Sequence, residues 1–203
     1  KKESDVQDYI PEMVEKMKAD GVAHESEGAL VIDVTEESDK KEIPPCIIVK
    51  SNGATLYATT DLATIVERET LFSPDQIIYV TDKRQALHFT QVFRAAKKAG
   101  LTKKETEFFF LGNGTMNGKD GKPFKTRDGG VLRLQQLRED VCQKVYEKIK
   151  DSRDYAEEEA REIAEKVGLA AIKYGDLSNQ IAKDYIFDMD RFTSFEGNTG
   201  PYI

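Results

Sequence analysis

The feature that most constrains the fold is a regular alternation of helix-like and strand-like patterns in the middle of the chain. The patterns follow one another at residues 61–71, 76–80, 84–100 and 106–112. This order of helix, strand, helix and strand indicates parallel strands, because a parallel connection needs a crossover of a dozen or more residues, which a helix supplies. The sequence therefore predicts an α/β fold that contains half of a doubly wound, parallel sheet.

The segments on either side of this core differ from it in character. Before the core, residues 29–34 are β-branched and strand-like, and residues 46–60 have the form of a hairpin around Asn52-Gly53, a pair that tolerates a tight turn. Further helical patterns lie at residues 5–20, 132–150 and 154–177. The sequence thus predicts a β-rich piece, an α/β core and a helical segment, at residues 1–50, 51–137 and 138–203.

Composition and charge exclude several classes of protein. Hydrophobic residues make up 39% of the chain, which is enough for a packed core, and no apolar run is long enough to span a membrane. The net charge of −7 argues against a nucleic-acid coat protein, although a local basic site remains compatible with it. Cys46 and Cys142 are too few for a disulfide framework or a zinc site, so we expect a cytoplasmic protein without a bound metal.

Polar residues stand where two expected strands end, at the edge where α/β sheets bind ligands. Asp61 opens a helix after a strand that is expected to end at Tyr57 to Thr59, and Gln85 and His88 share a face on the first turns of the next helix. The alternatives are an acid favoured by the helix dipole at a helix N-terminus and an exposed helical histidine. Both interpretations stay open on these residues alone.

The stretch GKDGKPFKTRDGG, residues 118–130, follows the last expected strand and combines glycines with cations. Glycine lets backbone amides approach a ligand, successive amides form anion-binding nests, and the cations attract phosphate oxygens. The spacing of a P-loop is absent, and a glycine–lysine surface loop is the alternative. Together with the residues at the strand ends, the stretch suggests a nucleotide site. Phosphates would repel the carboxylate of Asp61, so its presence there suggests a second, cationic ligand.

Six segments spread over the chain resemble, in the same order, those of bacterial-type arginyl-tRNA synthetases, which are class I aminoacyl-tRNA synthetases. They are ESEGALVIDV, LYATTDLA, GKDGKPFKTRDGG, IKYGDLSN, DYIFDMDRF and FEGNTGPYI. The resemblance implies the second half of a Rossmann-type catalytic domain, preceded by the end of a β-rich insertion and followed by helices that lead to an anticodon-binding domain. The family's histidine-glycine-histidine signature, which belongs to the first half, has no counterpart here, so we expect a central fragment.

The same resemblance implies a reaction and the substrates that the protein binds. The family activates L-arginine with ATP and Mg²⁺ to give arginyl-adenylate, and transfers the arginyl group to the 3′-terminal adenosine of tRNA(Arg). It uses no prosthetic group, the full-length form is expected to be a monomer, and the isolated chain is expected to be inactive. The competing interpretations are an adenylyltransferase of the same fold for another small acid and a non-catalytic tRNA-binding fragment.

The resemblance also implies an arginine site. The family holds the arginine guanidinium with two carboxylates and a tyrosine, and YATTDLA supplies Tyr57 and Asp61. The other acid belongs to a glycine-glutamate-serine sequence, for which this chain has KES, so Glu3 is its counterpart and Lys2 replaces the glycine. Gln85 matches a glutamine that reaches the substrate from the next strand end.

For ATP, the glycine-rich stretch matches the second class I signature, lysine-methionine-serine-lysine-serine. The catalytic candidates in it are Lys122, Lys125, Thr126 and Arg127. Thr126 stands at the second lysine, so part of the charge has to come from neighbouring cations or from another segment. The other ATP candidates are His88 and the backbone amides of Gly114, Thr115 and Met116, although the family often has a histidine where this chain has FLGN.

The last segment with an implied role is FEGNTGPYI, residues 195–203. In the family it lies where the catalytic core meets the tRNA-binding helices. Asn198 and Tyr202 are therefore candidates for contact with the acceptor end of tRNA, and a capping role in a turn is the alternative.

Overall fold

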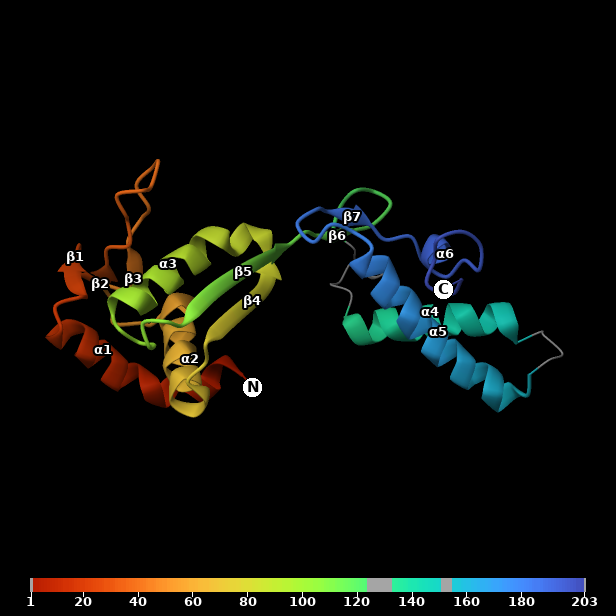
Figure 1. Cartoon of the computed structure of the whole chain (residues 1–203), viewed down its shortest axis with the longest axis horizontal. Helices are drawn as coiled ribbons and strands as arrows, with labels where there is room; N and C mark the ends of the chain where they lie inside the picture. Colours follow the sequence, from red (N-terminus) through yellow and green to blue (C-terminus); the bar gives the residue numbers. More distant parts are fainter. Residues whose placement is uncertain (1, 124–132, 151–154, 203) are drawn as a thin grey trace. The chain divides into compact units, whose positions relative to one another are not determined.

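The structure is a computed structural model, and it describes residues 2–123, 133–150 and 155–202. The chain forms two compact units, Lys1–Gly112 and Asn113–Ile203, which are considered separately (Figure 1). The elements up to the end of the parallel sheet are the 3₁₀ helix η1 (Glu3–Tyr9), α1 (Ile10–Ala19), β1 (His24–Ser26), β2 (Ala29–Ile32), β3 (Cys46–Val49), α2 (Tyr57–Phe72), β4 (Gln76–Asp82), the 3₁₀ helix η2 (Lys83–Gln85), α3 (Ala86–Lys98) and β5 (Glu107–Asn113). The elements that follow are β6 (Met116–Asn117), α4 (Leu134–Ile149), α5 (Glu157–Leu177), β7 (Tyr185–Ile186) and α6 (Met189–Phe192).

The N-terminal helical segment begins as η1 and continues as α1, which confirms the predicted amphipathic helix. Pro11 lies in the first turn of α1, where its missing N–H costs nothing. The residues of the predicted apolar face, each at most 7% exposed, are Val6, Ile10, Met13 and Met17. Because η1 packs against α2, Glu3 lies beside the first turns of that helix.

The β-rich piece is an antiparallel sheet in which β2 pairs with both β1 and β3. Ile32 of β2 and Ile48 of β3 are buried in a hydrophobic core that also contains Leu62 of α2 and Val92 of α3. Residues before and after position 50 therefore stabilise one another within the first unit. The predicted boundaries between three parts of the chain stay a prediction.

The predicted α/β fold with parallel strands is confirmed by β4 and β5. They form a two-stranded sheet, run in the same direction, and are joined by α3 (Figure 1). Phe108 of β5 stacks against Phe93 of α3, with ring centroids 4.9 Å apart. Because side chains alternate along a strand, the opposite face of this sheet carries exposed apolar side chains, namely Ile78, Val80, Phe109 and Leu111.

The predicted hairpin around Asn52-Gly53 is correct in its turn and wrong in its second arm. Gly53 adopts a φ of +81°, a conformation that glycine reaches without strain. Only a single antiparallel bridge, between Val49 and Thr55, follows the turn. The expected strand that ends at Tyr57 is instead the start of α2, four residues earlier than residue 61, where the helix was predicted to begin.

Thr59 explains this difference. Its β-branched side chain favours a strand by propensity, but its hydroxyl bonds to the backbone around the start of the helix. Thr59 Oγ1 lies 2.5 Å from the carbonyl oxygen of Ile48, to which it donates, and accepts from the amide of Leu56 at 3.1 Å. These bonds fix the first turn of α2, and they place Asp61 one helical turn after Tyr57 on the same face.

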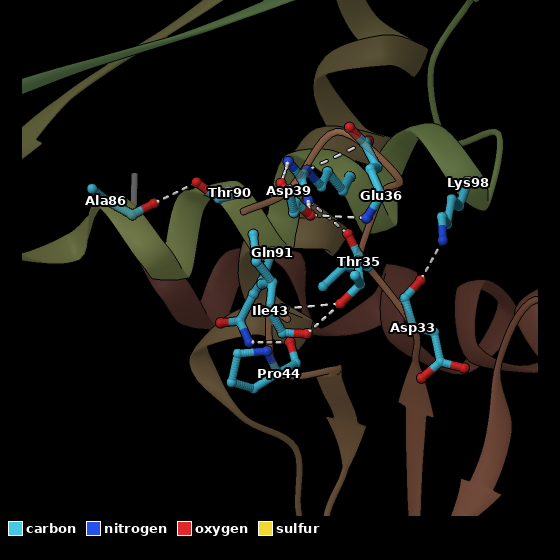
Figure 2. A network of polar contacts seen from close by, with 12 residues as sticks. Asp33, Thr35, Glu36, Asp39, Ile43, Pro44, Ala86, Thr90, Gln91 and Lys98 are labelled. Carbon is cyan, nitrogen blue, oxygen red and sulfur yellow. Dashed lines mark hydrogen bonds and ion pairs between the residues drawn. The ribbon is translucent and has the colours of Figure 1, made fainter. Parts of the chain in front are cut away.

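Side chains of α3 hold the loop between β2 and β3, residues 33–45, against the helix (Figure 2). Gln91 and Lys98 donate to backbone carbonyls of this loop at 2.8 and 2.6 Å. Arg94 donates to both carboxylate oxygens of Asp39, at 2.5 and 2.8 Å. Polar contacts therefore anchor α3 to this loop from Gln91 to its C-terminal end.

Asp39 is expected to make the stability of the first unit sensitive to acid. Its hydrogen bonds with Arg94 lower the pKa of the carboxyl to about 2, whereas an aspartate in an unfolded chain titrates near pH 4. The stabilising contribution is therefore complete above about pH 4 and is lost as the pH falls toward 2. We predict that Asp39→Asn lowers the melting temperature at pH 7, and that the difference from wild type shrinks as the pH falls from about 4 to 2. Thermal unfolding followed by circular dichroism measures this, with the exposed Asp8→Asn as control, and a difference that stays constant with pH contradicts it.

In the second unit, α4 and α5 pack against each other, which confirms the two predicted helices. The core of this unit contains Leu137 and Val141 of α4, Ala171 of α5 and Phe187. The short strands β6 and β7 pair in parallel, a contact that no sequence pattern predicted. Across the residues that the structure describes, no helix combines the length and the apolar character needed to cross a membrane.

Candidate functional site

A cavity of about 650 Å³ lies in the first unit, between η1, α2 and the start of α3. The predicted site residues that line it are Glu3, Tyr57, Asp61, Gln85 and His88. The fold thus brings all the candidates for arginine binding to one place, although they come from separate elements. One of the candidates for ATP binding, His88, lies with them.

One face of α2 forms much of the cavity wall. Its lining residues follow the spacing of three and four that places side chains on one side of a helix, and they are Tyr57, Thr60, Asp61, Thr64 and Arg68. Thr60, Thr64 and Arg68 are not among the predicted site residues. Thr60 falls in the predicted second arm of the hairpin, and a helix that begins at residue 61 leaves Tyr57 and Thr60 off the face that carries Thr64 and Arg68. A helical pattern drawn from Tyr57 would have shown them as one stripe.

Each of the two acids in the cavity is held by one neighbour. Thr60 Oγ1 lies 2.8 Å from Glu3 Oε1, and His88 Nε2 lies 2.6 Å from Asp61 Oδ2. Thr60 is buried, while the side chains of His88 and Asp61 are 28% and 30% exposed. Glu3 Oε2 and Asp61 Oδ1 have no hydrogen-bond partner within the described part of the chain. Each carboxylate can therefore accept from a ligand without breaking the bond that holds it.

The charge of Asp61 also acts on side chains behind the cavity wall. Burial, reinforced by Asp61, raises the pKa of the Cys46 thiol to about 12. Burial likewise raises the pKa of Tyr79 to about 12, an effect that Arg68 opposes and Asp61 reinforces. The guanidinium of Arg68 lies 5.1 Å from the centroid of the Tyr79 ring. The cavity is therefore acidic around Glu3 and Asp61, where a cationic group is favoured, and carries a positive charge further along α2.

Gln85 and Arg84 bring the end of β4 to the cavity. The amide nitrogen of Gln85 donates to Thr81 Oγ1 at 3.1 Å, and its oxygen has no hydrogen-bond partner among the described residues. The guanidinium of Arg84 donates to both carboxylate oxygens of Asp82, at 2.8 and 2.6 Å, and these bonds lower the pKa of Asp82 to about 2. Asp82 compensates the charge of Arg84, so this arginine does not cancel the acidic end of the cavity.

The candidates for ATP binding at Gly114, Thr115 and Met116 lie in the second unit. The amide of Gly114 donates to the Ile181 carbonyl at 2.8 Å, and the amide of Thr115 donates to Asp184 Oδ1 at 2.8 Å. Two of the three amides are therefore engaged within the protein. A nucleotide would have to displace these bonds or use neighbouring groups.

Only the first part of the glycine-rich stretch, residues 118–123, lies among the described residues. It is a tight turn in which the amide of Gly118 donates to the Lys122 carbonyl at 2.8 Å, and the Lys122 side chain is exposed. Lys119 Nζ forms an ion pair with Asp188 Oδ2 at 3.0 Å. The other catalytic candidates, which lie outside the described residues, are Lys125, Thr126 and Arg127.

The two candidates for tRNA contact lie in the last turn of the described chain. Asn198 lines a small cavity of about 70 Å³ beside α5. Tyr202 is 68% exposed, and its amide donates to the Thr199 carbonyl at 3.2 Å. Contact with tRNA and capping of the turn both stay predictions for these residues.

Comparison with known proteins gives the family of this chain. The model of a family described as tRNA synthetases class I (R), catalytic domain, matches residues 1–189. A protein named arginine–tRNA ligase from Agathobacter rectalis is 60% identical over 209 residues, which cover all of this chain and 35% of that protein. One of the same name from Alkaliphilus oremlandii is 58% identical over 201 residues, which cover 99% of this chain and 34% of that protein. The chain thus spans about a third of the length of these relatives.

Solved structures share the fold. An arginyl-tRNA synthetase from Plasmodium falciparum has a TM-score of 0.76 at 24% identity, covering 98% of this chain and 33% of its own. The enzyme from Thermus thermophilus has a TM-score of 0.72 at 18% identity, covering 96% of this chain and 38% of its own. The fold and the match of a family model to nearly the whole chain agree, and the chain belongs to the family of class I tRNA synthetases (R), whose catalytic domain it matches.

Proposed function

We propose that this chain supplies the arginine pocket of an arginine–tRNA ligase, which activates L-arginine with ATP and transfers it to the 3′-terminal adenosine of tRNA(Arg). The observation that carries the proposal is the meeting of Glu3 and Asp61 in one cavity, each with a carboxylate oxygen open to a ligand. The printed names of relatives that are 60% and 58% identical support it.

The guanidinium of arginine suits such a cavity. It is planar, always charged and carries five N–H donors, so two carboxylates can accept from different edges of one group. Lysine presents a compact ammonium instead, and citrulline presents no charge. Either ligand leaves at least one carboxylate without its ionic hydrogen bond, which is worth about 1.5–3 kcal/mol. The pocket is thus expected to select arginine over both.

Tyr57 and Gln85 complete the arginine pocket in this proposal. Tyr57 is 74% exposed at the first turn of α2, so its ring and hydroxyl are available to a ligand. Gln85 keeps an unpartnered amide oxygen at the cavity, which can accept a hydrogen bond from the α-amino group of the substrate. The two residues would orient the substrate after Glu3 and Asp61 have bound its guanidinium.

In the proposed activation step, a carboxylate oxygen of arginine attacks the α-phosphorus of ATP in line. A bond forms between that oxygen and the α-phosphorus, the bond from the α-phosphorus to the bridging oxygen breaks, and pyrophosphate leaves. No protein nucleophile is needed, because positioning and charge stabilisation lower the barrier. The cations proposed to stabilise the phosphates are Lys122, Lys125 and Arg127, with Thr126 between the last two.

Mg²⁺ enters this proposal as part of the ATP substrate, since it is usually held by substrate phosphates and one or two carboxylates. Among the described residues, no group of three or more His, Cys, Asp and Glu side chains is placed to hold a metal ion. The backbone near Gly114, Thr115 and Met116 is proposed to contact the adenine.

The finer architecture is also a proposal. We propose that residues 51–137, which include β4, α3 and β5, form the second half of a Rossmann-type domain. Residues 1–50 would be the end of an insertion that precedes it. The parallel strands and the shared fold support this assignment. Residues 138–203 would lead to the anticodon-binding domain, with Asn198 and Tyr202 near the acceptor end of tRNA. We further propose that the full-length enzyme acts as a monomer in the cytoplasm.

Exchange of radioactive pyrophosphate into ATP tests the proposal in the complete polypeptide to which this sequence belongs. The family needs tRNA for activation, so tRNA(Arg) is included. We expect exchange with L-arginine and none above background with lysine or citrulline. Exchange driven by another small acid would instead identify a different adenylyltransferase, and tRNA binding without any exchange would identify a non-catalytic protein.

A further inference from the structure

We infer that His88 is a positioning residue of the arginine pocket, where it orients Asp61 for the guanidinium, and that it is not a ligand of ATP. The inference rests on the proposed function, and it changes the role expected of this histidine. It follows from what the imidazole contacts. Both ends of that contact, Asp61 on α2 and His88 on α3, line the same cavity.

The contact itself is short and defines a donor. His88 Nε2 lies 2.6 Å from Asp61 Oδ2. An ionised carboxylate can only accept, so Nε2 carries the proton and donates it to Asp61. A charge-assisted bond of this length is stronger than a bond between neutral groups, and it fixes the rotation of the carboxylate. Asp61 Oδ1 is then left as the oxygen that faces a ligand.

The imidazole is in turn held by packing. Its ring meets the ring of Phe89 nearly edge-on, with centroids 5.0 Å apart and planes 78° apart. Phe89 is only 6% exposed and stacks on Phe110 of β5, with centroids 5.5 Å apart. The orientation of His88 is therefore set by the aromatic side chains between α3 and the parallel sheet. The protein's own packing thus fixes the imidazole, which is how a positioning residue acts.

The opposite acid has an equivalent arrangement. Thr60 Oγ1 lies 2.8 Å from Glu3 Oε1 and 3.0 Å from the carbonyl oxygen of Tyr57, so its single proton is shared between the carboxylate and the backbone of its own helix. Each carboxylate thus keeps one oxygen on a protein donor and presents the other. A planar ligand with several donors can bond to the exposed oxygen of each carboxylate. Loss of the bond from Thr60 or from His88 would let the corresponding carboxylate rotate and become hydrated. The arrangement favours a preorganised pocket for guanidinium over a flexible pair of acids.

The test is a pair of substitutions at His88 in the complete polypeptide, assayed by arginine-dependent pyrophosphate exchange with tRNA(Arg). His88→Leu removes the donor, and His88→Gln keeps an N–H at a similar reach. We expect the leucine variant to raise the KM for arginine about tenfold, as loss of one such bond implies, with kcat and the KM for ATP within about twofold. The glutamine variant should recover most of the loss, and a purely structural role would not be rescued in this way.

His24→Leu is the matched control. His24 is the other histidine of this sequence, and it lies on β1, outside the residues that line the cavity. Equal defects in the two His88 variants, or a raised KM for ATP with that for arginine unchanged, would overturn the inference. If the His88 variants and Asp61→Asn all leave the KM for arginine unchanged, the proposed function itself fails. If Asp61→Asn raises this KM but the His88 variants behave like wild type, the inference about His88 alone fails.

A second measurement follows the imidazole of His88 directly. Its nitrogens, labelled with ¹⁵N and assigned by the signals that are lost in the His88→Gln protein, should shift in the NMR spectrum when L-arginine is added. A non-hydrolysable ATP analogue without arginine should leave them in place. Signals that shift with the ATP analogue and not with L-arginine would contradict the inference and assign His88 to the ATP site.

Discussion

Asp61→Asn should raise the KM for arginine roughly 30- to 150-fold in pyrophosphate exchange, with the KM for ATP within about twofold of wild type. The substitution preserves size but removes the charge that accepts from the guanidinium, and an ionic hydrogen bond of this kind is worth about 2–3 kcal/mol. It also weakens the bond from His88 Nε2, now 2.6 Å from Asp61 Oδ2, because an amide is a poorer acceptor than a carboxylate. The effect therefore falls on arginine binding and exceeds that of either His88 substitution.

Asp75→Asn is the control for this variant. Asp75 is 94% exposed, forms a surface ion pair with Lys103, and does not line the cavity. Surface pairs of this kind contribute about 0–1 kcal/mol, so the KM values should not change. An Asp61→Asn enzyme whose KM values for arginine and ATP rise together would contradict a role for Asp61 in binding the guanidinium.

Gly114→Ala should destabilise the second unit by about 3 kcal/mol, at the upper end of the usual cost of overpacking. A Cβ at this position would lie 2.2 Å from the carbonyl oxygen of Lys183 and 2.6 Å from the amide nitrogen of Asp184. Both are backbone atoms, so the clash cannot be relieved by rotation of a side chain. The strain falls where β6 pairs with β7, next to the backbone proposed to contact adenine.

Hydrogen exchange followed by mass spectrometry locates this effect. The amides of Tyr185 and Phe187 donate to the carbonyls of Thr115 and Asn117, and they should lose protection in the Gly114→Ala protein. Thr115→Ala is the control, because it removes side-chain atoms next to Gly114 without adding any. Unchanged protection in Gly114→Ala, or an equal loss in Thr115→Ala, would show that close backbone contact at Gly114 does not hold the strands together.

The parts of the fold that the sequence predicted are those set by local pattern. The alternation that ends in β5 needs only hydrophobic periodicity and chain length, and the apolar face of α1 needs only the spacing of Val6, Ile10, Met13 and Met17. The start of α2 was misjudged because Thr59 has a strand propensity that its hydrogen bonds with Ile48 and Leu56 override. Leu56 is near Thr59 in the sequence, but Ile48 becomes its neighbour only in the folded chain, so propensity alone could not reveal this bond.

The candidate site divides in the same way. Asp61, Tyr57 and Gln85 could be singled out because their residue types stand at positions that match a family pattern. Thr60 could not, since its importance lies in a bond to Glu3, far away along the chain. His88 was singled out as a candidate for ATP binding, but its contact with Asp61 could not be predicted, because that contact depends on how α3 packs beside α2. Likewise, β6 and β7 are too short to show a pattern, and their pairing depends on the approach of two distant segments.

The most direct test is the crystal structure of the complete polypeptide grown with L-arginine. The guanidinium nitrogens are predicted to lie about 2.7–2.9 Å from oxygens of Asp61 and Glu3, the usual length of such ionic hydrogen bonds. His88 Nε2 should lie on Asp61 Oδ2, at the distance of 2.6 Å found in this structure. Density that places the α-amino group at Asp61, or the guanidinium outside this cavity, would contradict the assignment of the cavity as the arginine pocket.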